Sequence, residues 1–257
     1  FEVGTATMMA AKGAIVPVAK LMKDAGEPFD PKAYLPAVTG YYSDTQGNML
    51  SMPFNSSTAI FYINKDAFKK AKLDPNRAPK TWKEFTVAAE KLKAAGQPCV
   101  YTTGWPSWVH VENFSAWHNL PIGTKENGMA GLDTEFRVNT PAHIQHIATL
   151  GYYAKQGWFT YSGRRQEGED RFISGDCAML TSSSSAIGKI RKGAKFEFSA
   201  HFLPYHDDIK GAPQNSIIGG ATLWVLAGKP AGDYKGVAKF FTYLSRPEVQ
   251  MDWHTST

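Results

Sequence analysis

Residues 177–185 have the sequence Cys-Ala-Met-Leu-Thr-Ser-Ser-Ser-Ser, and the turn-forming pair Gly175-Asp176 precedes them. A short apolar run bounded by turn residues is typical of a buried β-strand. Ligands of open α/β sheets bind where loops leave the strand ends, so hydroxyl side chains at this place indicate a polar binding site. The stretch therefore predicts a buried strand over 177–181 and a candidate site directly after it.

A second buried strand is predicted over residues 99–103, followed by the loop Gly104-Trp105-Pro106-Ser107-Trp108. The helix before this strand has a clear start, because Thr81 can cap the first turn and Glu84 stands three residues later. Apolar residues at helical spacing follow up to Gly96. A helix, a buried strand and a glycine-containing loop thus succeed one another, as they do in α/β proteins.

The rest of the chain also alternates between predicted strands and helices. A hairpin over 40–50 precedes a strand over 58–63, and Thr140 with Pro141 begins another helix. The helix after Pro141 carries Ile144, Ile147 and Leu150. A further helix over 234–245 has a predicted core face of Val237, Phe240, Phe241 and Leu244. This alternation predicts an α/β fold with largely parallel sheets. A strand ending near Val3 leads us to expect that other elements precede residue 1.

The composition is that of a globular protein. Of 257 residues, 43% are hydrophobic and 13% aromatic, enough to bury a core. The 28 basic and 23 acidic residues give a net charge of +5, which suits an anionic small ligand. The basic residues are scattered rather than interleaved with aromatics, so we expect no nucleic-acid partner. No run reaches the roughly 18 apolar residues of a membrane span.

The two cysteines, Cys99 and Cys177, stand far apart and do not have metal-ligand spacing. In an exported protein they can form one disulfide, whereas in a reducing compartment they are two small buried hydrophobic residues. The spacing leaves both possibilities open.

Four polar or small-residue segments follow predicted strands and are candidates for a ligand site: Ser56-Ser57, 104–108, 182–185 and Gly219-Gly220. Glycines allow close approach of the backbone, hydroxyls and N–H groups can hold an anion, and indoles can cover a polyol. Each segment also has a simpler interpretation. The serines can be a solvated loop with one N-cap, the glycines a tight entry into a strand, and Trp105 and Trp108 partly buried core residues.

Catalytic chemistry has little support. The chain has no G-x-S-x-G elbow, no P-loop and no dinucleotide-binding glycine pattern, so we expect neither an enzyme nor a cofactor. His143 and His146 could place two imidazoles on one helix face as metal ligands, but most such pairs are surface residues and no third ligand is apparent, so we expect no metal. Asp44, Glu112 and Asp176 could form a glycosidase-like carboxylate set, as the acidic residues of many chains could.

Several blocks resemble the sn-glycerol-3-phosphate-binding periplasmic proteins of ABC importers, within family 1 of the extracellular solute-binding proteins. The blocks lie at 1–9, 40–44, 53–58, 62–68, 79–82, 112–117, 175–179 and 212–221. Asn-Lys-Asp-Ala-Phe and Lys-Thr-Trp are common to many carbohydrate-binding relatives. Pro-Phe-Asn-Ser-Ser-Thr at 53–58 and Gln-Asn-Ser-Ile-Ile-Gly-Gly-Ala at 214–221 are narrower and indicate this subtype.

The resemblance implies a ligand site. Glu2 would accept hydrogen bonds from glycerol hydroxyls, Ser57 and Ser183 would donate hydroxyls to the phosphate, Gly220 beside Gly219 would donate a backbone N–H, and Trp105 and Trp108 would pack on the glycerol carbons. A tyrosine upstream and a tyrosine and an arginine downstream of this chain would complete the family's site.

The resemblance also implies a periplasmic-binding-protein-like type II fold with two lobes and a hinge, truncated at both ends. Residues 1–257 would be the central part, contributing to both lobes. The protein would be periplasmic and monomeric, would capture sn-glycerol 3-phosphate or a glycerophosphodiester such as glycerophosphocholine, and would deliver it to the permease subunits without chemical change. An oligosaccharide-binding relative and a hydrolase of sugars or phosphate esters are the alternatives.

Overall fold

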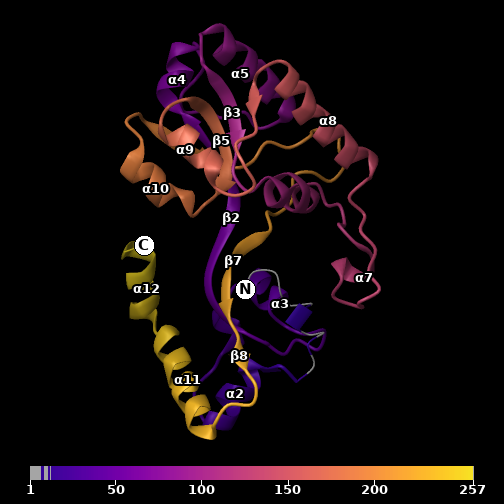
Figure 1. Ribbon diagram of the computed structural model, residues 1–257, viewed down its shortest axis with the longest axis vertical. Coiled ribbons are helices and arrows are strands. Elements are labelled where there is room, and N and C mark those ends of the chain that lie inside the picture. Colours follow the sequence, from indigo (N-terminus) through magenta and orange to yellow (C-terminus); the bar gives the residue numbers. More distant parts are fainter. Residues whose placement is uncertain (1–6, 9–10, 12, 257) are drawn as a thin grey trace. The chain divides into compact units, whose positions relative to one another are not determined.

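The computed structural model describes residues 7–8, 11 and 13–256. The chain divides into two compact units, each assembled from separate stretches of sequence (Figure 1). Unit 1 comprises residues 1–56, 125–134 and 218–257, and unit 2 comprises residues 57–124 and 135–217. In the part of the chain that the structure describes, no helix is long and apolar enough to cross a membrane.

Unit 2 is built on a mixed sheet with the strand order β4-β3-β5-β2-β6. Its strands are β3 (Cys99–Thr103), β4 (Phe159–Thr160), β5 (Cys177–Ser183), β6 (Phe198–His201) and the later part of β2 (Met52–Asn64). Its helices are α4 (Lys65–Lys70), α5 (Trp82–Ala94), η2 (Trp108–Glu112), α6 (Asn113–Trp117), α8 (Pro141–Lys155), α9 (Glu167–Ile173) and α10 (Ala186–Gly193). The α/β class is confirmed.

The direction of β2 corrects the expectation of largely parallel strands. β3 runs parallel to β4 and β5, but β2 runs antiparallel to β5 and β6. Ala59, near the beginning of this part of β2, pairs with Ser183 at the end of β5. β2 therefore enters the sheet at the edge where β3 and β5 end, and this edge carries the candidate site.

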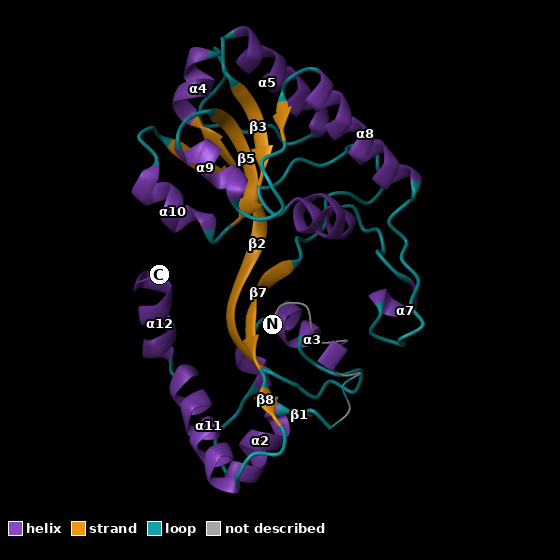
Figure 2. Ribbon diagram, in the orientation of Figure 1, coloured by secondary structure: helices purple, strands orange, loops and turns teal. Residues whose placement is uncertain are grey.

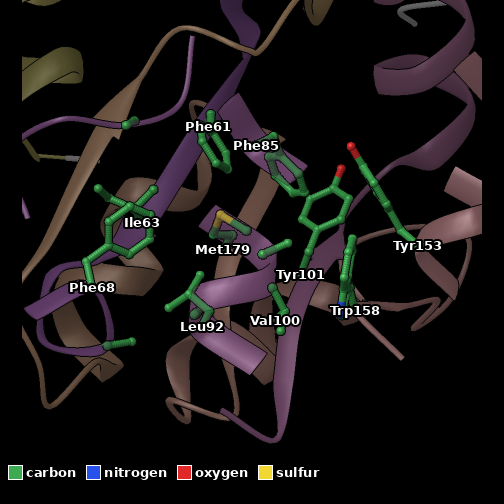
Figure 3. Close-up of a cluster of buried hydrophobic side chains, with 14 of the residues drawn as sticks. Phe61, Ile63, Phe68, Phe85, Leu92, Val100, Tyr101, Tyr153, Trp158 and Met179 are labelled. Carbon is green, nitrogen blue, oxygen red and sulfur yellow. The ribbon is translucent and has the colours of Figure 1, made fainter. Parts of the chain in front are cut away.

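Alternate residues of the strands face two separate cores. Phe61, Ile63 and Met179 belong to a cluster with residues of α4, α5 and α8, whereas Tyr62 and Leu180 pack with residues of α9 and α10. Successive strand residues point to opposite faces, so these helices cover both faces of the sheet (Figure 2). Aromatic rings of the first cluster interlock, as Figure 3 shows for Phe85, Tyr101 and Tyr153.

The capping prediction at Thr81 is confirmed. Thr81 Oγ1 accepts from the Glu84 N–H at 3.1 Å, and α5 begins at Trp82. The Glu84 side chain accepts from the Lys80 N–H at 2.8 Å rather than from the N-cap residue itself. Asn64 caps α4 in a similar way, accepting from the N–H groups of Asp66 and Ala67.

Of the three apolar residues that the sequence places on α8, only Leu150 is buried. Ile144 and Ile147 are 62% and 52% exposed, whereas His143, His146, Leu150 and Tyr153 are buried. The imidazoles can be buried because the surrounding core offers hydrogen-bond partners and aromatic rings, including Phe114, which stacks on His146 with centroids 4.2 Å apart. The helix thus presents its mixed polar face to the core, against the hydrophobic pattern.

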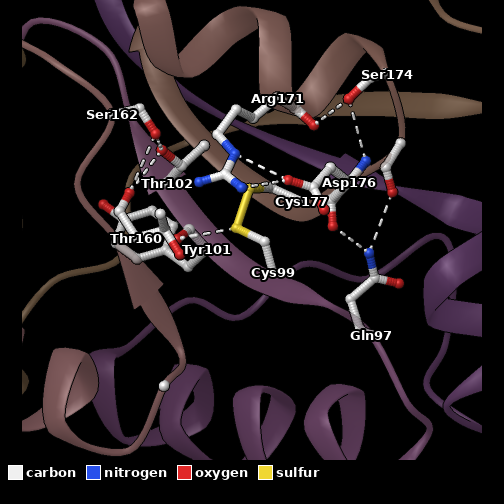
Figure 4. The surroundings of a disulfide bond; sticks show 12 residues. Gln97, Cys99, Tyr101, Thr102, Thr160, Ser162, Arg171, Ser174, Asp176 and Cys177 are labelled. Carbon is white, nitrogen blue, oxygen red and sulfur yellow. Dashed lines mark hydrogen bonds and ion pairs between the residues drawn. A yellow bond between two sulfur atoms is a disulfide. The ribbon is translucent and has the colours of Figure 1, made fainter.

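Cys99 and Cys177 form a disulfide, which decides the question that the sequence left open. The two residues are directly opposite in the parallel pair β3–β5 (Figure 4). Asp176, next to Cys177, accepts at its backbone oxygen from Gln97 Nε2 at 2.7 Å and binds Arg171 through its carboxylate at 2.8 Å. The bridge therefore joins the neighbouring strands β3 and β5 where both begin.

Unit 1 has its own core. Its strands are β1 (Ile15–Val16), β7 (Ile218–Leu223), β8 (Val225–Leu226) and the first part of β2, and its helices are α2 (Val18–Ala25), η1 (Pro31–Ala33), α3 (Pro36–Tyr41), α11 (Ala231–Leu244) and α12 (Pro247–Ser256). α7 (Thr124–Asn127) begins at the last residue before the 125–134 segment. β1 pairs with β8, β7 pairs with β2, and α2 and α11 pack over a cluster that includes Leu21, Met52 and Phe241.

Two predictions in unit 1 are corrected. The hairpin over 40–50 is reduced to a single bridge between Ser43 and Met49, because Gly40 and Tyr41 belong to α3 and Asp44 Oδ1 closes a turn by accepting from Gln46 N and Asn48 N. On α11, Phe241 is buried but Phe240 is 50% exposed. The predicted strand at Val3 lies outside the described residues.

Candidate functional site

Ser57 and Ser183 lie at the same edge of the unit 2 sheet. Ser57 is two residues before Ala59, which pairs with Ser183. Between them, the backbone of Thr58 makes two hydrogen bonds with Ser184: its oxygen accepts from Ser184 N at 2.8 Å, and its N–H donates to the side-chain Oγ of Ser184 at 3.1 Å. The structure therefore brings together the two predicted phosphate-binding serines.

The Ser183 hydroxyl lies at the entrance to α10. Ser183 is 5% exposed, its Oγ accepts from Ser185 N at 3.2 Å, and it lies 2.8 Å from Ser185 Oγ. Its backbone oxygen accepts from the Tyr62 hydroxyl at 3.0 Å. The segment is a structured turn rather than a solvated loop, and it places hydroxyl and N–H donors at a helix N-terminus, where anions are favoured.

Trp105 and Trp108 flank the end of β3. Both are half-buried and pack against a small cluster of Ala59, Val109 and Leu203. The core interpretation is therefore confirmed in part, and the site interpretation stays a prediction. Trp105 has φ = 50°, which is rare for a bulky residue, and its N–H donates to Arg165 O at 2.7 Å. Such a conformation persists where neighbouring contacts hold it, and it occurs often at ligand sites.

Gly219 and Gly220 lie in β7 of unit 1. Gly219 O accepts from Ser56 Oγ at 3.3 Å. Gly220 has φ = 116°, and a Cβ there would lie 2.2 Å from Asn55 O. Both glycines lie at the start of β7, as the tight entry into a strand predicts, and the close approach to Asn55 orients the Gly220 peptide. Glu2, the remaining predicted ligand residue, lies outside the described residues.

Sequence reasoning missed a buried carboxylate behind the serines. Glu169 is 5% exposed, and its Oε1 accepts from Ser182 Oγ at 2.8 Å. Burial raises the pKa of Glu169, while the Ser182 hydrogen bond and the positive charge of Lys189, 4.0 Å from Oε2, lower it. Ser182 thus points toward Glu169, on the opposite face of the strand from Thr181 and Ser183, which are also buried. The only sequence signal was an acidic residue one position after Gly168, which alone could not reveal the contact.

The histidines and two of the carboxylates that were considered for metal binding or catalysis make other contacts in the structure. Both ring nitrogens of His143 are hydrogen-bonded, to Thr140 Oγ1 at 2.6 Å and Ser115 Oγ at 2.8 Å, and both of His146 bind other histidines. Over the described residues, no group of three or more His, Cys, Asp or Glu side chains could hold a metal ion. Asp176 is paired with Arg171, and Asp44 closes its own turn.

An α/β fold with hydrogen-bond donors at strand ends and at a helix N-terminus is typical of a solute-binding protein. The chain belongs to the bacterial extracellular solute-binding proteins, whose family model matches residues 1–257. This confirms the family resemblance and the fold class. The contribution of residues 1–257 to two lobes stays a prediction.

The similar proteins are more specific. The chain is 52% identical, over 258 aligned residues, to the sn-glycerol-3-phosphate-binding periplasmic protein UgpB of Pectobacterium atrosepticum and to that of Salmonella typhimurium. The alignments cover 100% of this chain but only 58% and 59% of those proteins, so the chain spans less than two thirds of their length.

Among solved structures, UgpB from Mycobacterium tuberculosis in complex with glycerophosphocholine matches with a TM-score of 0.76 at 22% identity, over 95% of this chain and 60% of that one. A solute-binding protein from Thermotoga lettingae bound to α-D-tagatose gives 0.77 at 19% identity, over 99% and 63%. At these identities the matches show the fold alone.

Proposed function

We propose that this chain is part of the periplasmic ligand-binding protein of an ABC importer, that it captures sn-glycerol 3-phosphate or a glycerophosphodiester, and that it passes the ligand unchanged to the membrane permease. The observation that carries the proposal is the 52% identity, across the whole chain, to proteins named for binding sn-glycerol 3-phosphate. The glycerophosphodiester alternative is supported by the UgpB relative whose structure holds glycerophosphocholine.

The geometry fits an anionic polyol. Ser57 and Ser183 lie together at the sheet edge, with the first turn of α10 beside them. Trp105 and Trp108 offer half-buried indole surface, which suits the carbon face of a glycerol. In this proposal Ser57, Ser183 and the Gly220 N–H hold the phosphate, the indoles pack on the carbons, and Glu2 accepts from the hydroxyls. The disulfide supports a periplasmic location, because such bonds persist in oxidising compartments.

Thermal denaturation of the full-length protein tests the ligand. We expect sn-glycerol 3-phosphate or glycerophosphocholine at about one hundred times its Kd to stabilise the protein by about 2.7 kcal/mol, with maltose without effect. Recovered ligand should be unchanged by chromatography. Stabilisation by maltose alone would favour the oligosaccharide-binding alternative, and a reaction product would favour a hydrolase.

Substitution tests the site. Trp105→Ala or Ser183→Ala in the full-length protein should weaken binding of the stabilising ligand at least about tenfold, a loss of about 1.4 kcal/mol. Ser107→Ala is the matched control, because Ser107 is exposed and lies between the two tryptophans. Wild-type affinity in both site variants would show that the assignment of these residues is wrong.

A further inference from the structure

A continuous series of hydrogen-bonded side chains crosses the core of unit 2 and ends at the Trp105 turn. We call it the imidazole chain, and its members in order are His206, His146, His110, Tyr101, Thr181 and Thr103. All are at most 6% exposed. The successive distances are 3.2 Å (His206 Nε2 to His146 Nδ1), 3.0 Å (His146 Nε2 to His110 Nδ1), 2.9 Å (His110 Nε2 to Tyr101 Oη), 2.7 Å (Tyr101 Oη to Thr181 Oγ1) and 2.9 Å (Thr181 Oγ1 to Thr103 Oγ1).

The direction of these hydrogen bonds follows from the carbonyl end. Thr103 Oγ1 has a single proton, and its neighbours Gly104 O at 3.0 Å and Thr181 O at 3.2 Å can only accept it. Thr103 must therefore accept from the Thr181 hydroxyl. Thr181, whose proton is then used, accepts from the Tyr101 hydroxyl. Each hydroxyl thus donates toward Gly104.

The same reasoning assigns the imidazole tautomers. Tyr101 Oη has used its proton and so accepts from His110 Nε2–H. A neutral imidazole has one N–H, so His110 Nδ1 accepts from His146 Nε2–H, and His146 Nδ1 accepts from His206 Nε2–H. Burial supports the neutral forms, because it lowers the pKa of His110 to about 3 and holds the pKa of His146 well below its ordinary value.

The far end of the series is anchored independently. His118 Nδ1–H donates to Phe114 O at 2.8 Å, which leaves His118 Nε2 to accept from the backbone N–H of His206 at 2.9 Å. Lys83, Asp207 and Asp208 are the charged groups that act on the His206 ring. The backbone of His206 is therefore held by His118, independently of the hydrogen bond that its side chain donates to His146.

The near end fixes one peptide group of the candidate site. The oxygen of the Gly104–Trp105 peptide accepts from Thr103 Oγ1, and its N–H, on Trp105, donates to Arg165 O at 2.7 Å. Both polar groups of this peptide are thus occupied. The orientation of this peptide plane sets the positive φ of Trp105, which a free chain would rarely adopt.

We propose that Tyr101, supported by the histidines of the imidazole chain, is a positioning residue for the ligand site: it orients the Gly104–Trp105 peptide and so holds the Trp105 indole in its binding position. The effect on ligand affinity rests on the function proposed above, but the effect on the peptide does not. Tyr101 lies in the core (Figure 3) and acts only through Thr181 and Thr103.

Amide hydrogen exchange at Trp105 in the unliganded full-length protein tests this role. In Tyr101→Phe the Trp105 N–H should exchange about tenfold faster, which corresponds to about 1.4 kcal/mol of local opening. Tyr153→Phe is the matched control, because Tyr153 belongs to the same aromatic core (Figure 3). Its hydroxyl binds Thr86 Oγ1 and Trp82 O and is not a member of the imidazole chain. In this control Trp105 should exchange as in the wild type. Thr103→Val removes the last hydroxyl of the imidazole chain directly. It should also speed exchange of the Trp105 N–H, and it serves as the test if Tyr101→Phe folds poorly.

Equal Trp105 exchange in Tyr101→Phe and Tyr153→Phe would overturn the proposal, whether both are slow or both are fast. A ¹⁵N spectrum of the histidines at neutral pH should show Nε2–H tautomers for His110 and His146, and a proton on Nδ1 of either would also overturn it. With the ligand found above, affinity should fall in Tyr101→Phe and not in Tyr153→Phe. If the wild type binds none of the tested ligands, the proposed function fails while the exchange result still decides the role of Tyr101.

Discussion

Ser182 and Glu169 form a buried pair behind the candidate site, with Ser182 Oγ donating to Glu169 Oε1 at 2.8 Å. Ser183, the next residue, turns its hydroxyl toward Ser185 at the start of α10. Neighbouring serines of one strand therefore have different roles, since consecutive strand residues face opposite sides.

Substituting the two serines separately should distinguish these roles. Ser182→Ala leaves a buried carboxylate without its hydroxyl donor, so we expect about 1–3 kcal/mol lower free energy of unfolding and little change in ligand affinity. Ser183→Ala should weaken ligand binding and leave the free energy of unfolding nearly unchanged. Urea titrations and isothermal calorimetry on both variants check this, and parallel losses in the two variants would contradict the division of roles.

The glycine pair of β7 allows a matched steric test. Gly220→Ala would place a Cβ 2.2 Å from Asn55 O, so β7 must move away from β2. Gly228 also has a positive φ, 74°, but nothing within 4 Å of a Cβ. Gly228→Ala should therefore cost only the conformational strain of about 1 kcal/mol, whereas Gly220→Ala should cost about 3 kcal/mol or more. Equal melting temperatures for the two variants would refute the close approach.

Local sequence signals predicted the local structure well, because a cap or a turn depends on residues a few positions apart. Thr81 caps α5 as its spacing to Glu84 indicates, and the strand 177–181 lies within β5. The histidines of α8 show the limit of such signals. Ile144 and Ile147 are apolar but exposed, whereas the imidazoles are buried, because the partners of the imidazoles come from distant segments.

The site was predicted unevenly for the same reason. Ser57 lies beside one strand that the sequence predicts and Ser183 beside another, and the register of β2 on β5 brings the two serines together. Glu169 and Tyr101 act through hydroxyls about ten to eighty positions away, at Ser182 and Thr181, and no pattern of spacing reveals such contacts. The disulfide likewise depends on the pairing of β3 with β5, which the sequence does not specify.

The Cys99–Cys177 disulfide closes a loop across 78 residues of sequence. Constraining a loop of this length in the unfolded chain should stabilise the protein by about 2–4 kcal/mol. The double variant Cys99→Ala/Cys177→Ala should lose about this much in urea titrations. Dithiothreitol should destabilise the wild type under the same conditions and leave the double variant unchanged. A wild type insensitive to a reductant that demonstrably breaks the bond would contradict the estimate.

Acid should destabilise the protein through its buried histidines. Burial lowers the pKa of His110 to about 3, and burial, together with the nearby His206, lowers that of His118 to about 4 against opposing contributions from Phe114 O and Asp208. An unfolded histidine has a pKa of about 6.5, so between these values the unfolded state binds more protons. The stabilisation is complete above pH 6.5 and decreases as the pH falls toward 4 and 3. From pH 7.5 to pH 5 each of these histidines should lower the free energy of unfolding by about 2 kcal/mol.

Urea titrations across this range check the slope of the free energy of unfolding against pH. His110→Gln should reduce this slope by about one bound proton, since glutamine does not titrate. A free energy of unfolding that is the same at pH 5 and pH 7.5 would show that these imidazoles are not held neutral in the folded protein.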